Sequence, residues 1–142
     1  MNQERLFSES RFGQSFIKEF EARASQIAQE NREIETALEA EELELTRLRA
    51  TENPETFQRL AEAFDQKANR IREERRQEAQ SLVEFQETAQ QRFFRQVGPV
   101  LLELMREQGI SVIINNEAVV LSLPTVDLTN DAIERIDSVF PQ

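Results

Sequence analysis

The side chains that could carry chemistry in this sequence are carboxylates, guanidinium groups and hydroxyls. The chain contains no histidine, cysteine, tryptophan or tyrosine. Serine and aspartate are present, but no imidazole or thiol is available to activate a nucleophile or to bind a transition metal. The remaining amines, Lys18 and Lys67, fall at positions that we expect to be exposed. We therefore predict no enzyme, no catalytic residues and no cofactor.

Two charged clusters could instead bind a ligand. One is a run of carboxylates, at Glu39, Glu41, Glu42 and Glu44. On a straight helix these groups point in several directions and form no closed oxygen cage, so we predict no metal site. The other is a group of guanidinium side chains, at Arg70, Arg72, Arg75 and Arg76. They could attract acidic parts of a partner, but a solvated helix face with salt bridges to nearby glutamates is the simpler interpretation.

The overall charge limits the partners that the chain can attract. With 27 acidic and 17 basic side chains in 142 residues, the net charge is −10, which opposes attraction to nucleic acid or to an anionic lipid surface. Only three glycines and four prolines occur, which is typical of long helices, and ten phenylalanines argue for a packed core rather than disorder. We expect one domain, or a domain with an appendage.

A heptad pattern dominates the first half of the chain. Apolar residues recur in alternating steps of three and four, at Ile17, Phe20, Ala24, Ile27, Ile34, Leu38, Leu45 and Leu48. Asn31 and Glu41 occupy the two remaining positions of this seam. Asn53 and Pro54 then provide an N-cap and a first helical residue. The pattern predicts a long helix, a turn near residues 50–55 and a second helix.

The second helix carries its own seam. Its positions are Phe57, Ala61, Phe64, Ala68, Ile71, Arg75, Glu78, Leu82, Phe85 and Ala89. Antiparallel folding would bring Phe20 near Phe85 and Ile27 near Glu78. A polar stretch near Asn31 makes the middle of this hairpin its weakest part, where we expect local flexibility. The first helix would be roughly 50 Å long at about 1.5 Å per residue, so we expect an elongated molecule.

The sequence changes character after the second helix. Gly98 and Pro99 should kink or break the helix, and Gly109 should end it. Two β-branched runs at 111–114 and 118–121, joined by Asn115 and Asn116, then predict a β-hairpin. A last helix from about 130 to 140 would follow, with Thr129 as its N-cap.

A single copy of the chain cannot pair the edges of such a hairpin or bury both of its faces. Two strands alone are marginal in water, and both faces here are apolar. We therefore expect a homo-oligomer in which hairpins from several copies close one barrel. The predicted oligomerisation residues are Val112, Ile113, Ile114, Val119, Val120 and Leu121. The predicted fold class is mainly α with a small β body, in which a long antiparallel coiled-coil hairpin projects as an arm from an oligomeric barrel completed by the C-terminal helix.

The sequence resembles the Skp (OmpH-like) family of periplasmic holdase chaperones. The matching segments are Arg5-Leu6-Phe7, Phe64-Asp65-Gln66-Lys67-Ala68, Asn116-Glu117-Ala118-Val119-Val120-Leu121 and Asp127-Leu128-Thr129. The resemblance extends over nearly the whole chain, and the β-hairpin followed by the capped helix is its most specific part.

The resemblance implies a homotrimer with a β-barrel body and three helical arms, which holds unfolded outer-membrane proteins without ATP. The body would comprise residues 1–16 and 97–142, and the arm residues 17–96. Family members normally have a signal peptide and a short strand before the segment matching Asn2 to Phe7, so we expect a shortened chain of a periplasmic protein. The best-known relatives are basic, so contact with lipopolysaccharide or membrane is not expected to transfer to this acidic chain.

A holdase needs many weak, dispersed contacts with its clients. The candidate residues are apolar side chains beside the seam, at Phe16, Leu43, Val83 and Phe94. The alternative is that Phe16, Val83 and Phe94 thicken the core where arm and body join, and that Leu43 is an ordinary exposed leucine. The alternative function is a structural coiled-coil scaffold or tether that binds one folded partner.

Overall fold

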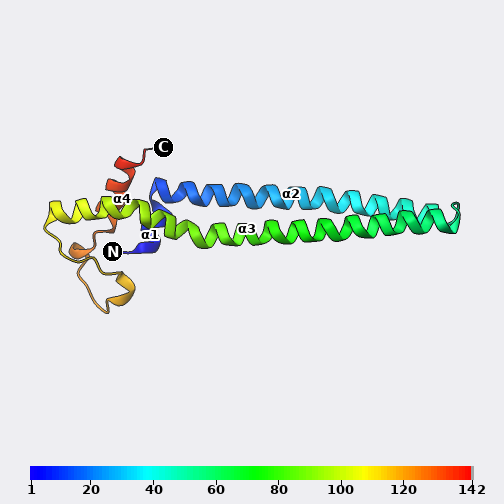
Figure 1. Cartoon of the computed structure of the whole chain (residues 1–142). Coiled ribbons are helices and arrows are strands. Elements are labelled where there is room, and N and C mark those ends of the chain that lie inside the picture. The colour runs from blue at the N-terminus through cyan, green and yellow to red at the C-terminus, as the bar shows by residue number, and fades with distance from the viewer. Residues whose placement is uncertain (142) are drawn as a thin grey trace. The chain divides into compact units, whose positions relative to one another are not determined.

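The computed structural model describes residues 1–141, which form four α-helices and two short 3₁₀ turns (Figure 1). The helices are α1 (Gln3–Glu9), α2 (Arg11–Leu48), α3 (Pro54–Gln108) and α4 (Thr129–Val139). The 3₁₀ turns are η1 (Asn116–Ala118) and η2 (Pro124–Val126). The chain divides into two compact units, one of Met1–Glu21 with the residues from Phe85 onward, and the other of Ala22–Glu84.

The second unit, Ala22–Glu84, is a helical hairpin that lies within the predicted range of 17–96. At its turn, Thr56 N donates to Asn53 Oδ1 at 2.8 Å, which confirms Asn53 as the N-cap with Pro54 as the first helical residue. Every predicted seam position from Ala24 to Leu82 is at least half-buried except Glu78, which is exposed. The heptad pattern therefore identified the face along which the two helices pack.

Polar contacts flank and interrupt this seam. Lys67 Nζ forms an ion pair with Glu41, and Arg75 donates to Glu35 Oε1 at 3.0 Å, so two salt bridges link α2 to α3. Ile27 and Glu78 line one shallow cavity, as the antiparallel register predicted. Asn31 is half-buried, and its Oδ1 atom accepts no hydrogen bond from the described residues. The middle of the hairpin is thus its most polar part.

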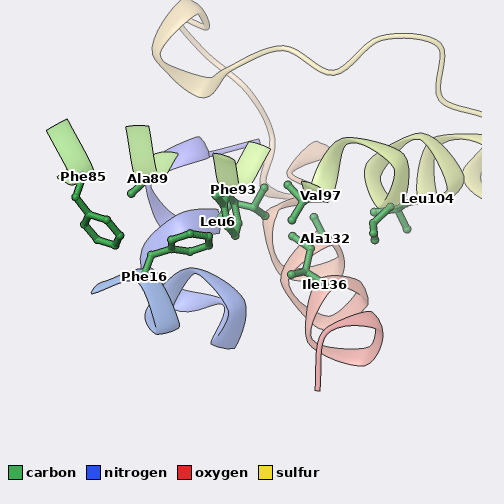
Figure 2. Close-up of a cluster of buried hydrophobic side chains, with 10 residues drawn as sticks. Leu6, Phe16, Phe85, Ala89, Phe93, Val97, Leu104, Ala132 and Ile136 are labelled. Atoms are coloured by element: carbon green, nitrogen blue, oxygen red, sulfur yellow. The ribbon is translucent and has the colours of Figure 1, made fainter. Parts of the chain in front are cut away.

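The first unit contains the hydrophobic core. Figure 2 shows buried side chains from α1, α2, α3 and α4 in one cluster: Leu6, Phe16, Phe85, Ala89, Phe93, Val97, Leu104, Ala132 and Ile136. Phe93 is fully buried and contacts Phe7 edge to face, with ring centroids 5.2 Å apart. Burying a side chain of this size contributes about 1.5–3 kcal/mol. Because α1 also packs on α4, both ends of the described chain stabilise the same core.

A kink or a break was predicted at Gly98 and Pro99, and helix α3 continues through Pro99 without a break. The buried residues Val97, Val100 and Leu104 lie on both sides of Pro99 and stabilise the helix by packing into one core. Helix α3 ends as predicted. Gly109 has φ of 67°, and Ile110 N donates to Met105 O at 2.8 Å, which is the hydrogen bond of a Schellman cap.

The predicted β-hairpin is absent, and no strand forms within residues 1–141. Residues 111–114 and 118–121 do not pair with each other, and η1 occupies the expected turn. The one ladder-like contact involves Met1. Its N atom donates to Ile114 O at 3.2 Å, and Asn116 N donates to Met1 O at 3.0 Å, the alternation of a parallel β pair. An isolated two-stranded hairpin is marginal in water, and within residues 1–141 no strand is present to extend it into a larger sheet.

The start of α4 also differs from the prediction. Thr129 was expected to be the N-cap, but it is the first helical residue and Leu128 precedes it as the cap. The Thr129 hydroxyl is buried, accepts from Asn2 N at 2.8 Å and donates to Asp127 Oδ1. The side chain therefore ties the start of α1 to the start of α4.

Two glycines provide a matched test of this packing. A Cβ atom at Gly13 would lie 1.7 Å from the carbonyl oxygen of Phe7, whereas one at Gly98 would meet nothing within 4 Å. We expect Gly13→Ala to destabilise the protein by about 3 kcal/mol or more through backbone overlap. Gly98→Ala should stabilise it by about 0.5–1 kcal/mol, because alanine favours a helix interior. Urea unfolding followed by circular dichroism measures both, and equal effects would contradict the close approach of α1 to α2.

Candidate binding and assembly surfaces

The segment between α3 and α4 exposes an unusual amount of apolar surface. We call residues 110–126 the apolar segment. Seven large hydrophobic side chains in it are exposed: Val112, Ile114, Val119, Val120, Leu121, Leu123 and Val126. Val120 and Leu121 have relative exposures of 102% and 92%. Scattered exposed hydrophobic residues are ordinary, but a dense group of this kind marks an interaction surface.

The backbone of the apolar segment is also incompletely paired. In the described part of the chain, the N–H groups of Val112, Ile113, Val120 and Leu121 donate to no backbone carbonyl. Strands with unpaired N–H and C=O groups are templates for pairing with another chain. Of the predicted oligomerisation residues, all except the half-buried Ile113 have exposed side chains. Two of them have a paired backbone group, since Val119 N donates to Asn116 O and Ile114 O accepts from Met1 N.

A polar cluster fixes the C-terminal end of the apolar segment. Asp127 Oδ1 accepts from Thr129 N at 3.0 Å and from the Thr129 hydroxyl, and it lies 3.8 Å from the Met1 amino nitrogen. These contacts, led by the hydrogen bond from the Thr129 side chain, lower the pKa of Asp127 below its usual value. The cluster joins Met1, Asn2 and the start of α4 at the point where the apolar segment ends.

The four candidate client-binding residues fall into two groups. Phe16 is buried in the core and Phe94 is half-buried against it, with its ring 5.1 Å from that of Phe93. These positions agree with the alternative that both residues thicken the core. Val83 and Leu43 have relative exposures of 52% and 73%. Val83 therefore does not thicken the core, and both side chains are accessible to a partner.

Each of the two charged clusters on the hairpin contains residues that form ion pairs. Arg76 donates to Glu73 at 2.7 Å, Arg47 donates to Glu44 at 2.6 Å, and hydrogen bonds from these arginines lower the pKa of both glutamates. Both pairs are spaced by three residues, as on a solvated helix face. Within residues 1–141, no group of three carboxylates is arranged to hold a metal ion.

None of the helices in the described chain combines the length and the apolar character needed to cross a bilayer.

Sequence comparison identifies the family. Residues 1–136 match the sequence model of the family described as outer membrane protein (OmpH-like). The chain belongs to the OmpH-like family. This membership confirms the resemblance inferred from the sequence, and it supports a chaperone role rather than an enzymatic one. No curated protein matches the chain.

A solved structure supports the same fold. The chain is similar to the crystal structure of a candidate outer membrane chaperone (OmpH-like) from Caulobacter crescentus, with a TM-score of 0.89. The two sequences are 20% identical, and the match covers 96% of this chain and 80% of the other. At this identity the likeness establishes the OmpH-like fold and nothing more specific.

Sequence reasoning missed a groove in the first unit. The antiparallel register predicted that Phe20 lies near Phe85, and both line one open cavity of about 560 Å³ together with Ile17 and Ala89, which the register did not predict. The signal was present in the sequence. Ala89, the last position of the predicted second seam, is too small to fill the space beside the phenylalanines.

The Asp127 cluster predicts a specific acid response. A lowered pKa means that the folded state favours the carboxylate, so its stabilising effect is present above the usual value of 3.8 and is lost as pH falls through the lowered pKa. We expect Asp127→Asn to be less stable than the wild type at pH 6, and the difference to shrink below pH about 4.

Urea unfolding at a series of pH values measures this effect. Asp65→Asn, an exposed change on the hairpin that removes the same charge, serves as the control. A stability difference for Asp127→Asn that stays constant down to pH about 2 would show that the charge does not matter.

Proposed function

We propose that this OmpH-like protein is an ATP-independent holdase chaperone of the periplasm that keeps unfolded outer-membrane proteins from aggregating. The observation that carries the proposal is the exposed apolar segment in a chain of the OmpH-like family. Exposed apolar surface of this density must be covered in the working protein, and another copy of the chain is the simplest cover.

Assembly is the first part of the proposal. The apolar segments of several copies pair their free backbone groups, and by the family resemblance the number of copies is three. Such pairing removes the open edge that a single chain leaves, and it buries the side chains of Val112, Val120 and Leu121. The arms of the assembly are the helical hairpins, proposed as residues 17–96, and the body is the remainder.

Client binding is the second part. A surface that holds an unfolded chain needs weak and scattered apolar contacts, since one strong pocket traps its client and a fully polar wall does not retain it. Leu43 and Val83 fit this requirement, because each is an exposed apolar side chain on a highly charged helical hairpin. We retain Phe16 and Phe94 only as positions that support the surface from the core.

The holdase function predicts protection without nucleotide. An unfolded outer-membrane protein diluted from urea should remain soluble when a stoichiometric amount of this protein is present, and light scattering should stay near baseline. An excess of an unrelated unfolded protein should compete for the same surface. Light scattering as high as in the absence of this protein would reject the holdase function. Protection that is not reduced by unrelated unfolded proteins would favour a scaffold that binds one defined partner.

If the apolar segment is the interface between copies, a single charged residue introduced there should prevent assembly. Val112 has a relative exposure of 68%, so Val112→Asp costs little within one chain. We expect this variant to lose assembly while it keeps most of its helical circular dichroism, because a buried aspartate between copies is unfavourable. Leu43→Asp on the hairpin is the matched control and should assemble normally. A wild-type mass for Val112→Asp would show that the apolar segment is not the interface.

A further inference from the structure

The groove in the first unit has the size and lining of a binding pocket. It lies among α1, α2 and α3, and its volume of about 560 Å³ falls within the roughly 300–1,000 Å³ of typical ligand pockets. Its lining residues all belong to Met1–Glu21 or to the part of the unit that starts at Phe85. The pocket is therefore built within one compact unit.

The floor and walls of the groove are apolar. Phe16, Phe85 and Ala89 are buried, and they lie at one end of the core cluster (Figure 2). Ile17 and Phe20 are half-buried, so part of each side chain remains accessible. An apolar group that enters the groove would remove this surface from water and contact rings already fixed by the core.

The rim of the groove is acidic. Its exposed lining residues are Glu21 and Glu87, with the neutral amides of Gln86 and Gln90. No lysine or arginine lines the groove in the described structure. Arg92 is engaged with Phe16, 5.8 Å from the centre of its ring, and is not a lining residue. The negative rim of a chain with net charge −10 favours a cationic occupant over an anionic one.

We propose that the groove takes an aromatic or aliphatic side chain of an unfolded client segment in which lysine or arginine lies next to that side chain. The apolar side chain fills the space beside Phe20 and Phe85, and the neighbouring cation pairs with Glu21 or Glu87. The inference rests on the proposed holdase function, and it adds a preference: clients are selected by basic residues beside their apolar ones.

The test uses two labelled peptides with the full-length protein. One carries a single phenylalanine flanked by lysines, and the other carries the same phenylalanine flanked by glutamates. Fluorescence anisotropy at low salt should show about fivefold to tenfold tighter binding of the lysine peptide, as expected for two exposed ion pairs. Equal affinity for the two peptides would overturn the proposal.

Two double variants test whether the preference for the lysine peptide arises at the groove. Glu21→Gln with Glu87→Gln should reduce the discrimination to about twofold or less, because the shape is kept and both charges are removed. The control is Glu33→Gln with Glu74→Gln, which removes the same charge from exposed positions on the hairpin and should keep the discrimination. If both double variants reduce the discrimination between the two peptides equally, the overall charge of the protein causes the preference and the groove proposal is wrong.

A third variant tests the apolar part. Ile17→Ser should weaken binding of both peptides while the mass of the assembly stays the same. Wild-type affinity in this variant would overturn the proposal, and so would a loss of assembly, because the groove would then be filled by another copy. The peptide-binding results can be distinguished from those of the light-scattering assay for holdase function. Protection of clients without peptide discrimination rejects only the inference, whereas discrimination without protection rejects only the holdase.

Discussion

The apolar segment, residues 110–126, has backbone groups without hydrogen-bond partners and apolar side chains without cover, and the architecture of the protein depends on how these are satisfied. Its side chains are exposed and much of its backbone has no internal partner. Backbone groups need hydrogen bonds and exposed apolar groups need cover, and the described residues leave the N–H groups of Val120 and Leu121 without a backbone partner and their side chains exposed. Met1 contacts Ile114 and Asn116 within the segment, and Asp127 is fixed at its C-terminal end, while Val120 and Leu121 remain exposed and available to other chains. The proposed assembly follows from this incompleteness.

The two compact units contribute different physical properties. The first unit has an aromatic core, in which Phe93 lies among Phe7, Phe12 and Phe94. The second unit, Ala22–Glu84, has a narrow seam of half-buried residues bordered by salt bridges such as Arg75 with Glu35. A surface of this kind presents isolated apolar side chains among charges. It is suited to weak contact with many sequences, which is what a holdase requires.

Much of the helical structure could be predicted because its causes are local. The heptad spacing identified the seam, Asn53 and Pro54 identified the turn, and Gly109 identified the end of α3. The differences from the prediction have non-local causes. The strands at 111–114 and 118–121 need partners that one chain does not supply, α3 continues through Pro99, and Thr129 bonds to Asn2 from the other end of the sequence. Of the candidate client-binding residues, the pattern could identify those beside the seam, but only packing separates the buried Phe16 from the exposed Leu43. The groove was also missed, because the small side chain of Ala89 indicates space beside Phe20 and Phe85 only once the packing of their neighbours is known.

The mass of the protein in solution shows whether other copies of the chain cover the apolar segment. Sedimentation equilibrium over a wide concentration range measures it without any label or substitution. The account predicts a species with three times the 16.5 kDa mass of one chain, which dissociates only on dilution. A stable species with the mass of a single chain at every concentration would contradict it, because the apolar segment would then remain uncovered in the native protein.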